Sequence, residues 1–260
     1  MSEMGEQGRT SDAADPQPDD PSLAGAPRDS DSWAKKVDRL EAPSRPGVRG
    51  TNVAGRRLAG PVQGFGRMWQ KTYRVRVAEE VSPAAAIATW KAHFPEFWPP
   101  GNRFAGALAG ISPGDVALLD LAVGGGVKLS TGVFVLYADD LSFTLMTPEG
   151  HMFAGWISFS AEPALNATLL QAQVLMRAND PLYELGMTFG GHAKEDRFWT
   201  QTLTAVAARL GTAPAQVEVQ SVCVDGRRQW RRAGNVRHNS MVRSVVQTAL
   251  GALQHRHQSS

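Results

Sequence analysis

Histidine, acidic, phenolic and arginine side chains occur at three points of the sequence where their spacing could support chemistry. The first is His151, which follows the turn-forming residues Pro148-Glu149-Gly150 and begins an apolar run. A histidine at the mouth of a cavity can act as a general base or hold a ligand by a hydrogen bond. A histidine in this place can equally cap the turn, and the sequence leaves both interpretations open.

The second group lies within eight residues and comprises Arg177, Asp180, Tyr183 and Glu184. An acid, a phenol and a guanidinium near a cavity rim could polarise a carbonyl substrate. Asp180 precedes a proline, however, and an Asp-Pro pair is also typical of a turn with ordinary surface pairing around it. Together with His151, Asp180 and Tyr183 are the candidate acid and base residues of an enzyme.

The third group is a run of arginines around a tryptophan, formed by Arg227, Arg228, Trp230, Arg231 and Arg232. It lies in a segment, 213–260, that holds seven Lys/Arg and two Asp/Glu, whereas the whole chain has a net charge of +2. Arginines beside an aromatic ring can bind nucleic acid through phosphates and base stacking, or an anionic membrane surface. They can also remain in water while the neighbouring apolar residues pack on the domain or on a second subunit.

Patterns typical of metal or cofactor sites are not found in the sequence. Cys223 is the only cysteine, which excludes an internal disulfide and a cysteine-cluster metal site. Asp139 and Asp140 are neighbours at a strand end, so their side chains diverge and a hairpin turn is the better interpretation. We therefore predict no metal and no cofactor. The single cysteine, the lack of a signal-peptide pattern and the lack of a membrane-spanning apolar run indicate a cytoplasmic protein.

The strands that would position these residues follow from apolar periodicity. Alternation in 72–78 places Tyr73, Val75 and Val77 on one face of a strand. Further strands are predicted between tight turns, at residues 115–122, 128–137, 142–147, 152–160 and 168–177. The strand at 128–137 is apolar on both faces, which indicates a central strand that is covered on both sides. Short strands with no helix between them imply antiparallel pairing.

Two helices are predicted, one between the strands at 72–78 and 115–122 and one after the strand at 168–177. Ser82 is a good N-cap and Pro83 a good first residue for a helix that runs to about Phe94. The second helix spans 195–210, where apolar residues recur on one face, and Gly211 ends it.

The two ends of the chain differ from this central domain, which we place at 64–212. Residues 1–63 are rich in Gly, Pro, Ser and Asp and are predicted to be a disordered tail, with one short helix at 32–40. Residues 213–260 are predicted to form a basic extension with a strand at 217–224, a hairpin turn and a return strand at 227–232. A last helix begins near Asn239 or Ser240, and its apolar stripe must be buried against a partner. The stripe consists of Val242, Val245, Val246, Ala249, Leu250 and Leu253.

Three stretches of sequence resemble a bacterial branch of the START and birch-pollen-allergen superfamily, which includes polyketide cyclases. They are residues 64–73 (GFGRMWQKTY), 97–102 (FWPPGN) and 147–156 (TPEGHMFAGW), and the resemblance covers residues 64–211. It implies an α+β helix-grip fold, in which a curved antiparallel sheet wraps around a C-terminal helix and leaves a cavity between them. Lipids, sterols, polyketides and hormones are typical occupants in that superfamily. The chain departs from it by adding the extension after residue 212.

These observations support three hypotheses for function. The leading one is the binding of a hydrophobic small molecule or lipid in the cavity between sheet and helix. The second is an enzyme of the polyketide cyclase or aromatase kind. The third is an interaction module that acts through the basic extension, with residues 240–253 contacting a second copy or another protein. For the first hypothesis, the predicted ligand-binding residues are Phe134, Tyr137, Met146, Met152, Trp156 and Met176.

Overall fold

The computed structural model describes residues 30–44, 50–106, 110–124 and 127–245. The fold is that of the compact unit that begins at Asp31. No helix in these described ranges is both long enough and apolar enough to cross a membrane.

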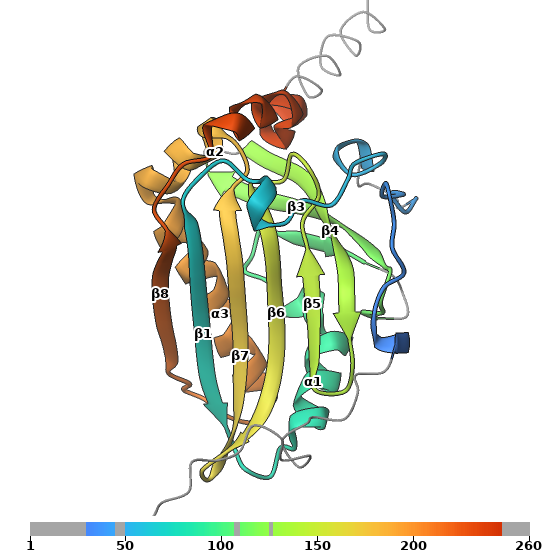
Figure 1. Ribbon diagram of the computed structural model, residues 1–260. Coiled ribbons are helices and arrows are strands. Elements are labelled where there is room, and N and C mark those ends of the chain that lie inside the picture. Colours follow the sequence, from blue (N-terminus) through green and yellow to red (C-terminus); the bar gives the residue numbers. More distant parts are fainter. Residues whose placement is uncertain (1–29, 45–49, 107–109, 125–126, 246–260) are drawn as a thin grey trace, which may run out of the picture. The chain divides into compact units, whose positions relative to one another are not determined.

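One antiparallel sheet of eight strands forms the centre of this unit (Figure 1). Its strands follow one another across the sheet in the order β2-β3-β4-β5-β6-β7-β1-β8. The first strand in the sequence, β1, therefore lies between the last two, β7 and β8. The strands are β1 (Met68–Val77), β2 (Arg103–Ala105), β3 (Val116–Gly124), β4 (Val127–Ala138), β5 (Ser142–Met146), β6 (Phe153–Ala164), β7 (Ala167–Ala178) and β8 (Val217–Asp225). The six strands predicted between residues 72 and 177 are all present, because each carries the alternation of a half-buried strand or the apolar run of a central one.

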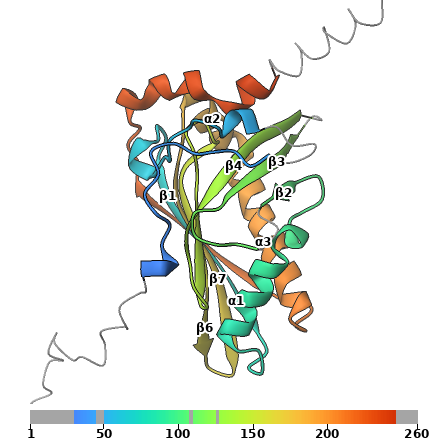
Figure 2. The same cartoon turned by 90° about the vertical axis from the view of Figure 1, so that its right-hand side faces the viewer.

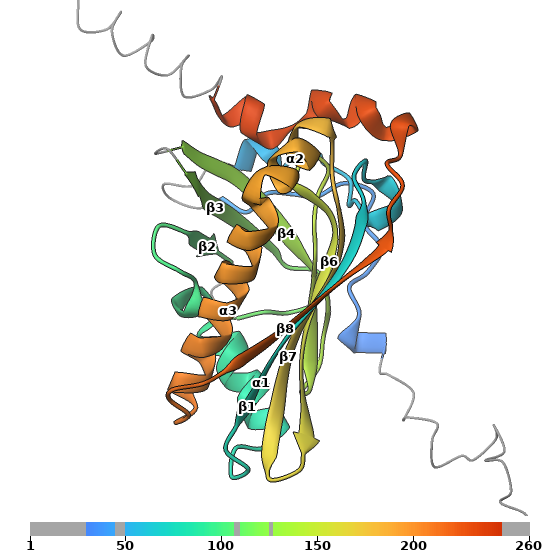
Figure 3. The same cartoon turned by 90° about the vertical axis from the view of Figure 1, so that its left-hand side faces the viewer.

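The helices lie on one face of the sheet, which we call the inner face. α1 (Pro83–Ala92) and the long α3 (His192–Arg209) both cover it, as Figures 2 and 3 show from two sides. The side chain of Ser82 caps α1 by accepting a hydrogen bond from Ala85 N at 3.2 Å, as the sequence predicts. Between the sheet and α3 the chain forms α2 (Pro181–Gly186) and a π-helical turn, η5 (Met187–Gly191). This arrangement confirms the predicted α+β helix-grip fold.

Aromatic side chains fill one end of the space between the inner face and the helices. Trp90 and Phe94 pack there against Phe143 and Phe159, and all four are fully buried. The rings of Phe143 and Phe159 stack with centroids 4.6 Å apart, while the other pairs meet edge to face. The ring of Trp199 on α3 lies 5.5 Å from that of Phe159 and joins this cluster to Phe198.

The outer face of the sheet is covered by residues 31–44 and 50–63, which corrects the prediction that residues 1–63 form a disordered tail. Leu40 and Val53 are buried against Phe134 of β4 and Leu118 of β3. Backbone hydrogen bonds support the contact, as from Ala34 N to Leu136 O and from Ala59 N to Thr147 O. A few apolar side chains and these bonds are enough to order a segment whose composition is poor in large apolar residues. The expectation for residues 1–29 lies outside the described residues.

The described part of this segment also differs from the predicted short helix at 32–40. Only a 3-10 turn, η1 (Ser30–Ser32), forms there, and two further 3-10 turns follow at η2 (Gly50–Asn52) and η3 (Pro61–Gln63). Trp33 instead forms a bridge with Tyr137 on β4, and their ring centroids are 4.7 Å apart. Strand β4 is therefore covered on both faces, as its apolar run predicts.

The segment after residue 212 adds a strand to the sheet. β8 pairs along its length with β1, so the predicted strand is present but its predicted hairpin partner at 227–232 is not. The chain after Asp225 turns away from the sheet edge and forms a 3-10 helix, η6 (Trp230–His238). The edge of β1 offers β8 backbone hydrogen-bond partners from Val217 to Asp225, more than a short strand at 227–232 could provide. A helix then begins at Ser240 and is described to Val245. Of the predicted apolar stripe, Val242 and Val245 are 47% and 51% exposed, and Val246, Ala249, Leu250 and Leu253 lie outside the described residues.

The covered outer face can be tested by truncating Phe134, which is 2% exposed. We expect Phe134→Ala to lower the free energy of unfolding by about 3–5 kcal/mol, because it leaves a cavity between β4 and the N-terminal cover. Chemical denaturation monitored by circular dichroism measures this change. Leu165→Ala is the control, since Leu165 is 86% exposed and its truncation should change stability by less than about 0.5 kcal/mol. Equal, small effects of both substitutions would contradict a packed outer face.

Candidate functional site: a cavity between the sheet and α3

A cavity of about 320 Å³ lies between the inner face of the sheet and α3, next to the aromatic cluster. Its lining combines aromatic rings, among them Trp98, Phe198 and Trp199, with smaller side chains such as Val174, Met176 and Ile157. η5 and α3 supply the opposite wall, including Met187 and residues of the first turns of α3. Most of the lining is apolar, so water inside it would find few hydrogen-bonding partners.

Three of the six predicted ligand-binding residues lie at this cavity, namely Met152, Trp156 and Met176. Met176 points inward from β7 and is 1% exposed. Trp156 contributes to the wall, but its ring reaches the outer face, where it lies beside Gly60. Whether these residues bind a ligand stays a prediction.

The other three predicted ligand-binding residues, Phe134, Tyr137 and Met146, do not line the cavity, and the prediction for them is corrected. Phe134 is paired with Met146, and Met146 with Trp156, so these side chains share the outer face of the sheet. Tyr137 also faces outward, against Trp33. A strand that is apolar on both faces gives no sign of which face is the inner one, and the larger side chains here point outward.

His151 lines the cavity but is already engaged with the backbone. Its Nδ1 accepts a hydrogen bond from Phe153 N at 3.0 Å, which is the turn-capping geometry that the sequence left open. The side chain is 5% exposed, and its burial lowers the pKa of His151 to about 4. The imidazole is therefore neutral at neutral pH and acts as a structural acceptor in this turn.

Asp180 and Tyr183 stabilise the start of α2 and the C-terminal segment. Asp180 is fully buried and caps α2 by accepting from Leu182 N and Tyr183 N, and its second oxygen accepts from Asn239 Nδ2 at 2.7 Å. Tyr183 lines the cavity, and its hydroxyl accepts from Met241 N at 3.0 Å. Burial raises the pKa of Tyr183, so its hydroxyl stays protonated.

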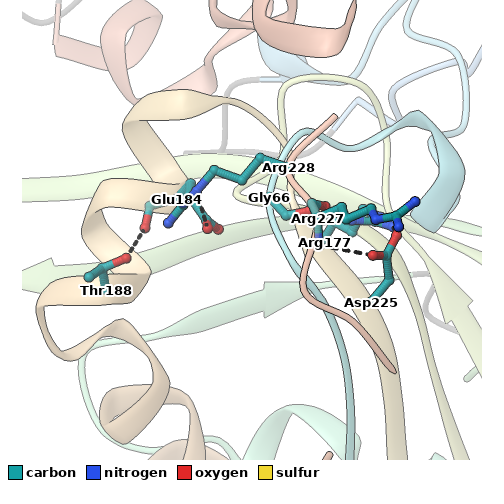
Figure 4. Close-up of polar contacts among 7 residues, drawn as sticks. All are labelled: Gly66, Arg177, Glu184, Thr188, Asp225, Arg227 and Arg228. Carbon is teal, nitrogen blue, oxygen red and sulfur yellow. Dashed lines mark hydrogen bonds and ion pairs between the residues drawn. The ribbon is translucent and has the colours of Figure 1, made fainter. Parts of the chain in front are cut away.

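Arg177 and Glu184, the remaining members of the predicted cluster, bind the segment that follows β8 (Figure 4). Arg177 donates to Gly66 O at 2.6 Å and to Arg227 O at 2.9 Å, and it forms an ion pair with Asp225. Glu184 accepts from Arg228 Nε at 2.9 Å. These groups therefore hold residues 225–228 against the sheet, and neither they nor Asp180 belong to the cavity lining.

The C-terminal segment closes one end of the cavity. Met241 contributes to its lining, while the Ser240 backbone N–H donates to Gly150 O at 2.9 Å. From the outer side, Asn52 Nδ2 lies 3.0 Å from Ser244 Oγ and 3.3 Å from Ser240 O. Two segments from opposite ends of the chain thus meet at this rim.

A buried ionic cluster borders the cavity, and we did not predict it from the sequence. Lys71 of β1 is 1% exposed, and its Nζ lies 2.8 Å from Asp196 Oδ1 and 3.0 Å from Glu195 Oε2. It also donates to His192 O at 3.3 Å, and the Tyr73 hydroxyl donates to Asp196 Oδ1 at 2.7 Å. Lys71 is in phase with the inward residues of β1, so the alternation itself was a signal for a buried lysine that needs acidic partners.

Glu195 is the member of this cluster that faces the cavity. It is 8% exposed and belongs to the cavity lining. Its approach to Lys71 is ionic without the alignment of a hydrogen bond, and neither of its carboxyl oxygens has a hydrogen-bond partner among the described residues. Burial raises the pKa of Glu195 to about 7, although the nearby Lys71 opposes the change. At the border of the cavity, burial thus disfavours the charged form of Glu195 while the adjacent Lys71 favours it.

Metal ligands do not gather at this site or elsewhere within the described ranges, where no three His, Cys, Asp or Glu side chains form a group that could hold an ion. The carboxylates of Glu195 and Asp196 already flank the ammonium group of Lys71, and its positive charge would oppose a cation there.

Comparisons with known proteins find similarity only among solved structures. No protein-family model matches the chain, and no curated protein matches it. The di-domain ARO/CYC protein StfQ from the steffimycin biosynthetic pathway is 12% identical, with a TM-score of 0.44 over 56% of this chain and 53% of that one. The KanY protein is 13% identical, with a TM-score of 0.41 over 56% of this chain and 99% of that one. A major latex-like protein from Panax ginseng is 14% identical, with a TM-score of 0.37 over 55% of this chain and 98% of that one.

The raised pKa of Glu195 predicts a specific dependence of stability on pH. Below about 4.5 the carboxyl is protonated in both the folded and the unfolded chain, and its contribution is fully present. Between about 4.5 and 7 the unfolded chain loses this proton while the folded chain keeps it, so stability falls as pH rises. Glu195→Gln has no such titration. We therefore expect the variant to keep up to roughly 3 kcal/mol of unfolding free energy that the parent protein loses over this range. Denaturation at a series of pH values measures it, and parallel profiles for both proteins would contradict it.

The lowered pKa of His151 predicts the opposite slope. The unfolded chain takes up a proton as pH falls below about 6.5, whereas the folded chain does so only near 4. Stability therefore decreases as the pH is lowered from 6.5 to 4. In His151→Asn the amide oxygen can still accept from Phe153 N, but nothing titrates. The variant should therefore lose up to roughly 3 kcal/mol less than the parent protein between pH 6.5 and 4. An unchanged slope in the same denaturation series would show that His151 becomes protonated within the fold.

Proposed function

We propose that this protein binds a hydrophobic small molecule or lipid in the cavity between the sheet and α3. The observation that carries the proposal is the cavity itself, about 320 Å³ in volume and lined mainly by apolar and aromatic side chains. Sites for small molecules are typically concave, mostly apolar and about 300–1,000 Å³ in volume. A folded core of this size normally fills such a space with side chains, because empty space costs stability.

The geometry favours binding over the cyclase or aromatase alternative. His151 and Tyr183 reach the cavity wall, but each already accepts a backbone hydrogen bond from within the fold. Asp180 is fully buried and occupied as a helix cap. Of these three residues only His151 keeps an atom outside the bonds given, its Nε2, so they do not form a paired acid and base at the cavity.

Action through residues 213–260 stays a separate proposal. β8 completes the sheet, Met241 lines the cavity and Arg228 pairs with Glu184, so much of the segment belongs to the domain. Binding of nucleic acid or an anionic membrane through Arg227, Arg228, Arg231 and Arg232, and a partner contact through 240–253, stay predictions. The same is true of the cytoplasmic location.

A pair of matched substitutions tests the cavity as the binding site. Val174 lines the cavity and is 5% exposed, whereas Val219 lies on β8 and is 47% exposed. We expect Val174→Phe to weaken binding of the fluorescent apolar probe 1-aminoanthracene about tenfold or more, because the ring occupies the space that the probe needs. Val219→Phe should leave its affinity unchanged. Fluorescence titration of the full chain gives both values.

Native mass spectrometry of the purified full chain provides an independent measurement. A co-purified small molecule that is bound by the parent protein and lost in Val174→Phe would support the proposal. Equal probe affinity in the parent protein, Val174→Phe and Val219→Phe would place probe binding outside the cavity and overturn the proposal.

A further inference from the structure

We propose that the Nε2–H group of His151 is the hydrogen-bond donor of the cavity, and that the cavity selects apolar molecules which carry a neutral acceptor oxygen, such as a ketone carbonyl. The inference rests on the proposed function, because it concerns the ligand of the same cavity. It is carried by the buried polar side chains of the lining, since only one of them keeps an atom that is neither engaged within the fold nor sealed from the cavity.

Two of the buried polar side chains in the lining are fully engaged with the backbone. The Thr147 hydroxyl bonds to backbone groups of Ala59 and Gly155. The Tyr183 hydroxyl accepts from a backbone N–H and lies 3.4 Å from Gly150 O, to which it donates. These two side chains therefore maintain the walls and have no free atom to offer a ligand.

Two further polar groups of the lining are sealed from the cavity. Glu195 is paired with the buried Lys71, whose Nζ lies 3.0 Å from Oε2, and its carboxyl oxygens have almost no accessible surface. The same is true of the Trp98 Nε1 atom, although the ring of Trp98 contributes to the wall. A ligand in the cavity cannot reach these atoms.

His151 is the buried polar side chain that differs from these. It is 5% exposed and belongs to the lining. Its Nε2 atom makes no hydrogen bond among the described residues, yet it keeps accessible surface, unlike the carboxyl oxygens of Glu195. A buried polar atom without a partner forfeits the bond that it would make with water. The occupant of the cavity can supply that bond.

The backbone of Phe153 decides which ring nitrogen of His151 carries the proton. The Phe153 N–H points at Nδ1 from 3.0 Å, so a proton on Nδ1 would collide with it, and Phe153 O lies farther away, at 3.2 Å. The neutral ring therefore carries its proton on Nε2. Burial keeps the ring neutral by lowering the pKa of His151 to about 4. His151 thus offers the cavity one donor and no acceptor.

The other polar side chains of the lining lie nearer the solvent. Asn102, Trp156 and Trp199 are partly buried, and Lys194 is exposed. Asn102 also donates to one backbone carbonyl at 2.9 Å and accepts from one backbone N–H at 3.0 Å. A hydrogen bond to a hydrated group replaces one with water and adds little to affinity, whereas a bond to a buried, unpartnered group adds more.

Charge favours a neutral acceptor at His151. The ring is neutral, so a carboxylate there would give up its hydration for one hydrogen bond and no opposite charge. Lys194 is the one cation of the lining within the described ranges, and it is exposed, while the buried Lys71 beside the wall is matched by Glu195. An ammonium group has only donors and cannot accept from Nε2–H. A carbonyl oxygen meets the need without adding charge.

Three naphthalenes of nearly the same shape test this inference. 2-Acetylnaphthalene has a carbonyl, 2-isopropenylnaphthalene has a methylene group in place of that oxygen, and 2-naphthoate has an anionic acceptor. Each is used to displace 1-aminoanthracene from the full chain. We expect 2-acetylnaphthalene to bind roughly 5- to 10-fold more tightly than 2-isopropenylnaphthalene, the net value of one buried hydrogen bond. 2-Naphthoate should bind more weakly than 2-acetylnaphthalene.

Two substitutions separate the roles of the two ring nitrogens of His151. In His151→Asn the amide oxygen can still accept from Phe153 N, but no atom reaches the position of Nε2. In His151→Gln the longer side chain can place its amide donor there and gives up the bond to Phe153 N. His151→Asn should bring the affinities for the ketone and its methylene analogue within about twofold of each other, while His151→Gln keeps the preference. A purely structural role of His151 predicts the reverse order.

Infrared spectroscopy of bound 2-acetylnaphthalene detects the hydrogen bond directly. Its carbonyl stretching band should lie at lower wavenumber in the parent protein than in His151→Asn, because the hydrogen bond weakens the C=O bond. The band in the parent protein should also lie below that of the free ketone in hexane, a comparison that does not depend on any variant folding.

Each of the remaining results decides against one of the two proposals. An unchanged preference for the ketone in His151→Asn, an equal loss of both neutral ligands in that variant, or a carbonyl band like that in hexane would overturn the inference and leave cavity binding intact. Tightest binding of 2-naphthoate would place the polar end at Lys194 and overturn it as well. A failure of all three naphthalenes and of 1-aminoanthracene to bind the parent protein would overturn the proposed function itself.

Discussion

The burial of Lys71 is the constraint on which the rest of the domain depends. Placing an ammonium group between a sheet and a helix is costly unless its charge is matched nearby, and removing one partner of such a group is strongly destabilising. Two consecutive acids at the start of α3, Glu195 and Asp196, provide the match. Their approach to β1 fixes the register of α3 over the sheet. The helix is thereby held by an ionic cluster near its N-terminus and by aromatic packing around Trp199, and both Glu195 and Trp199 belong to the cavity lining.

Both faces of the sheet require a cover, and segments far apart in the sequence supply it. Residues 31–44 and 50–63 cover the outer face, while α1 and α3 cover the inner one (Figure 2). The rim near Ser240 joins the two covers, because Asn52 from the outer side contacts Ser240 and Ser244.

The fold could be predicted largely from local patterns, and the site only in part. Alternation in β1 and β6, the Ser82 cap and the apolar face of α3 are properties of short stretches of sequence, and they identify the elements correctly. The choice between the two faces of β4 is not local: Phe134 and Val133 are both apolar, and only the N-terminal cover decides which points outward. The same applies to β8, whose partner is chosen by the free edge of β1 and not by the adjacent Asp225-Gly226 turn. We did not predict a place for Glu195 in the site, because an acid in the first turn of a helix ordinarily interacts favourably with the helix dipole and faces water.

The position of β1 between β7 and β8 also has a consequence for the order of events during synthesis. β1 is the first long strand to leave the ribosome, yet it pairs with β7 and β8, which come much later in the sequence. Val77 pairs with Thr168, for example, and Met68 with Asp225. Both of its hydrogen-bonding edges therefore stay open until nearly the whole domain has been translated. Such long-range pairing slows folding and prolongs the exposure of strand edges to other chains. The nascent protein must keep this strand, apolar on one face, out of wrong pairings until β8 has been made.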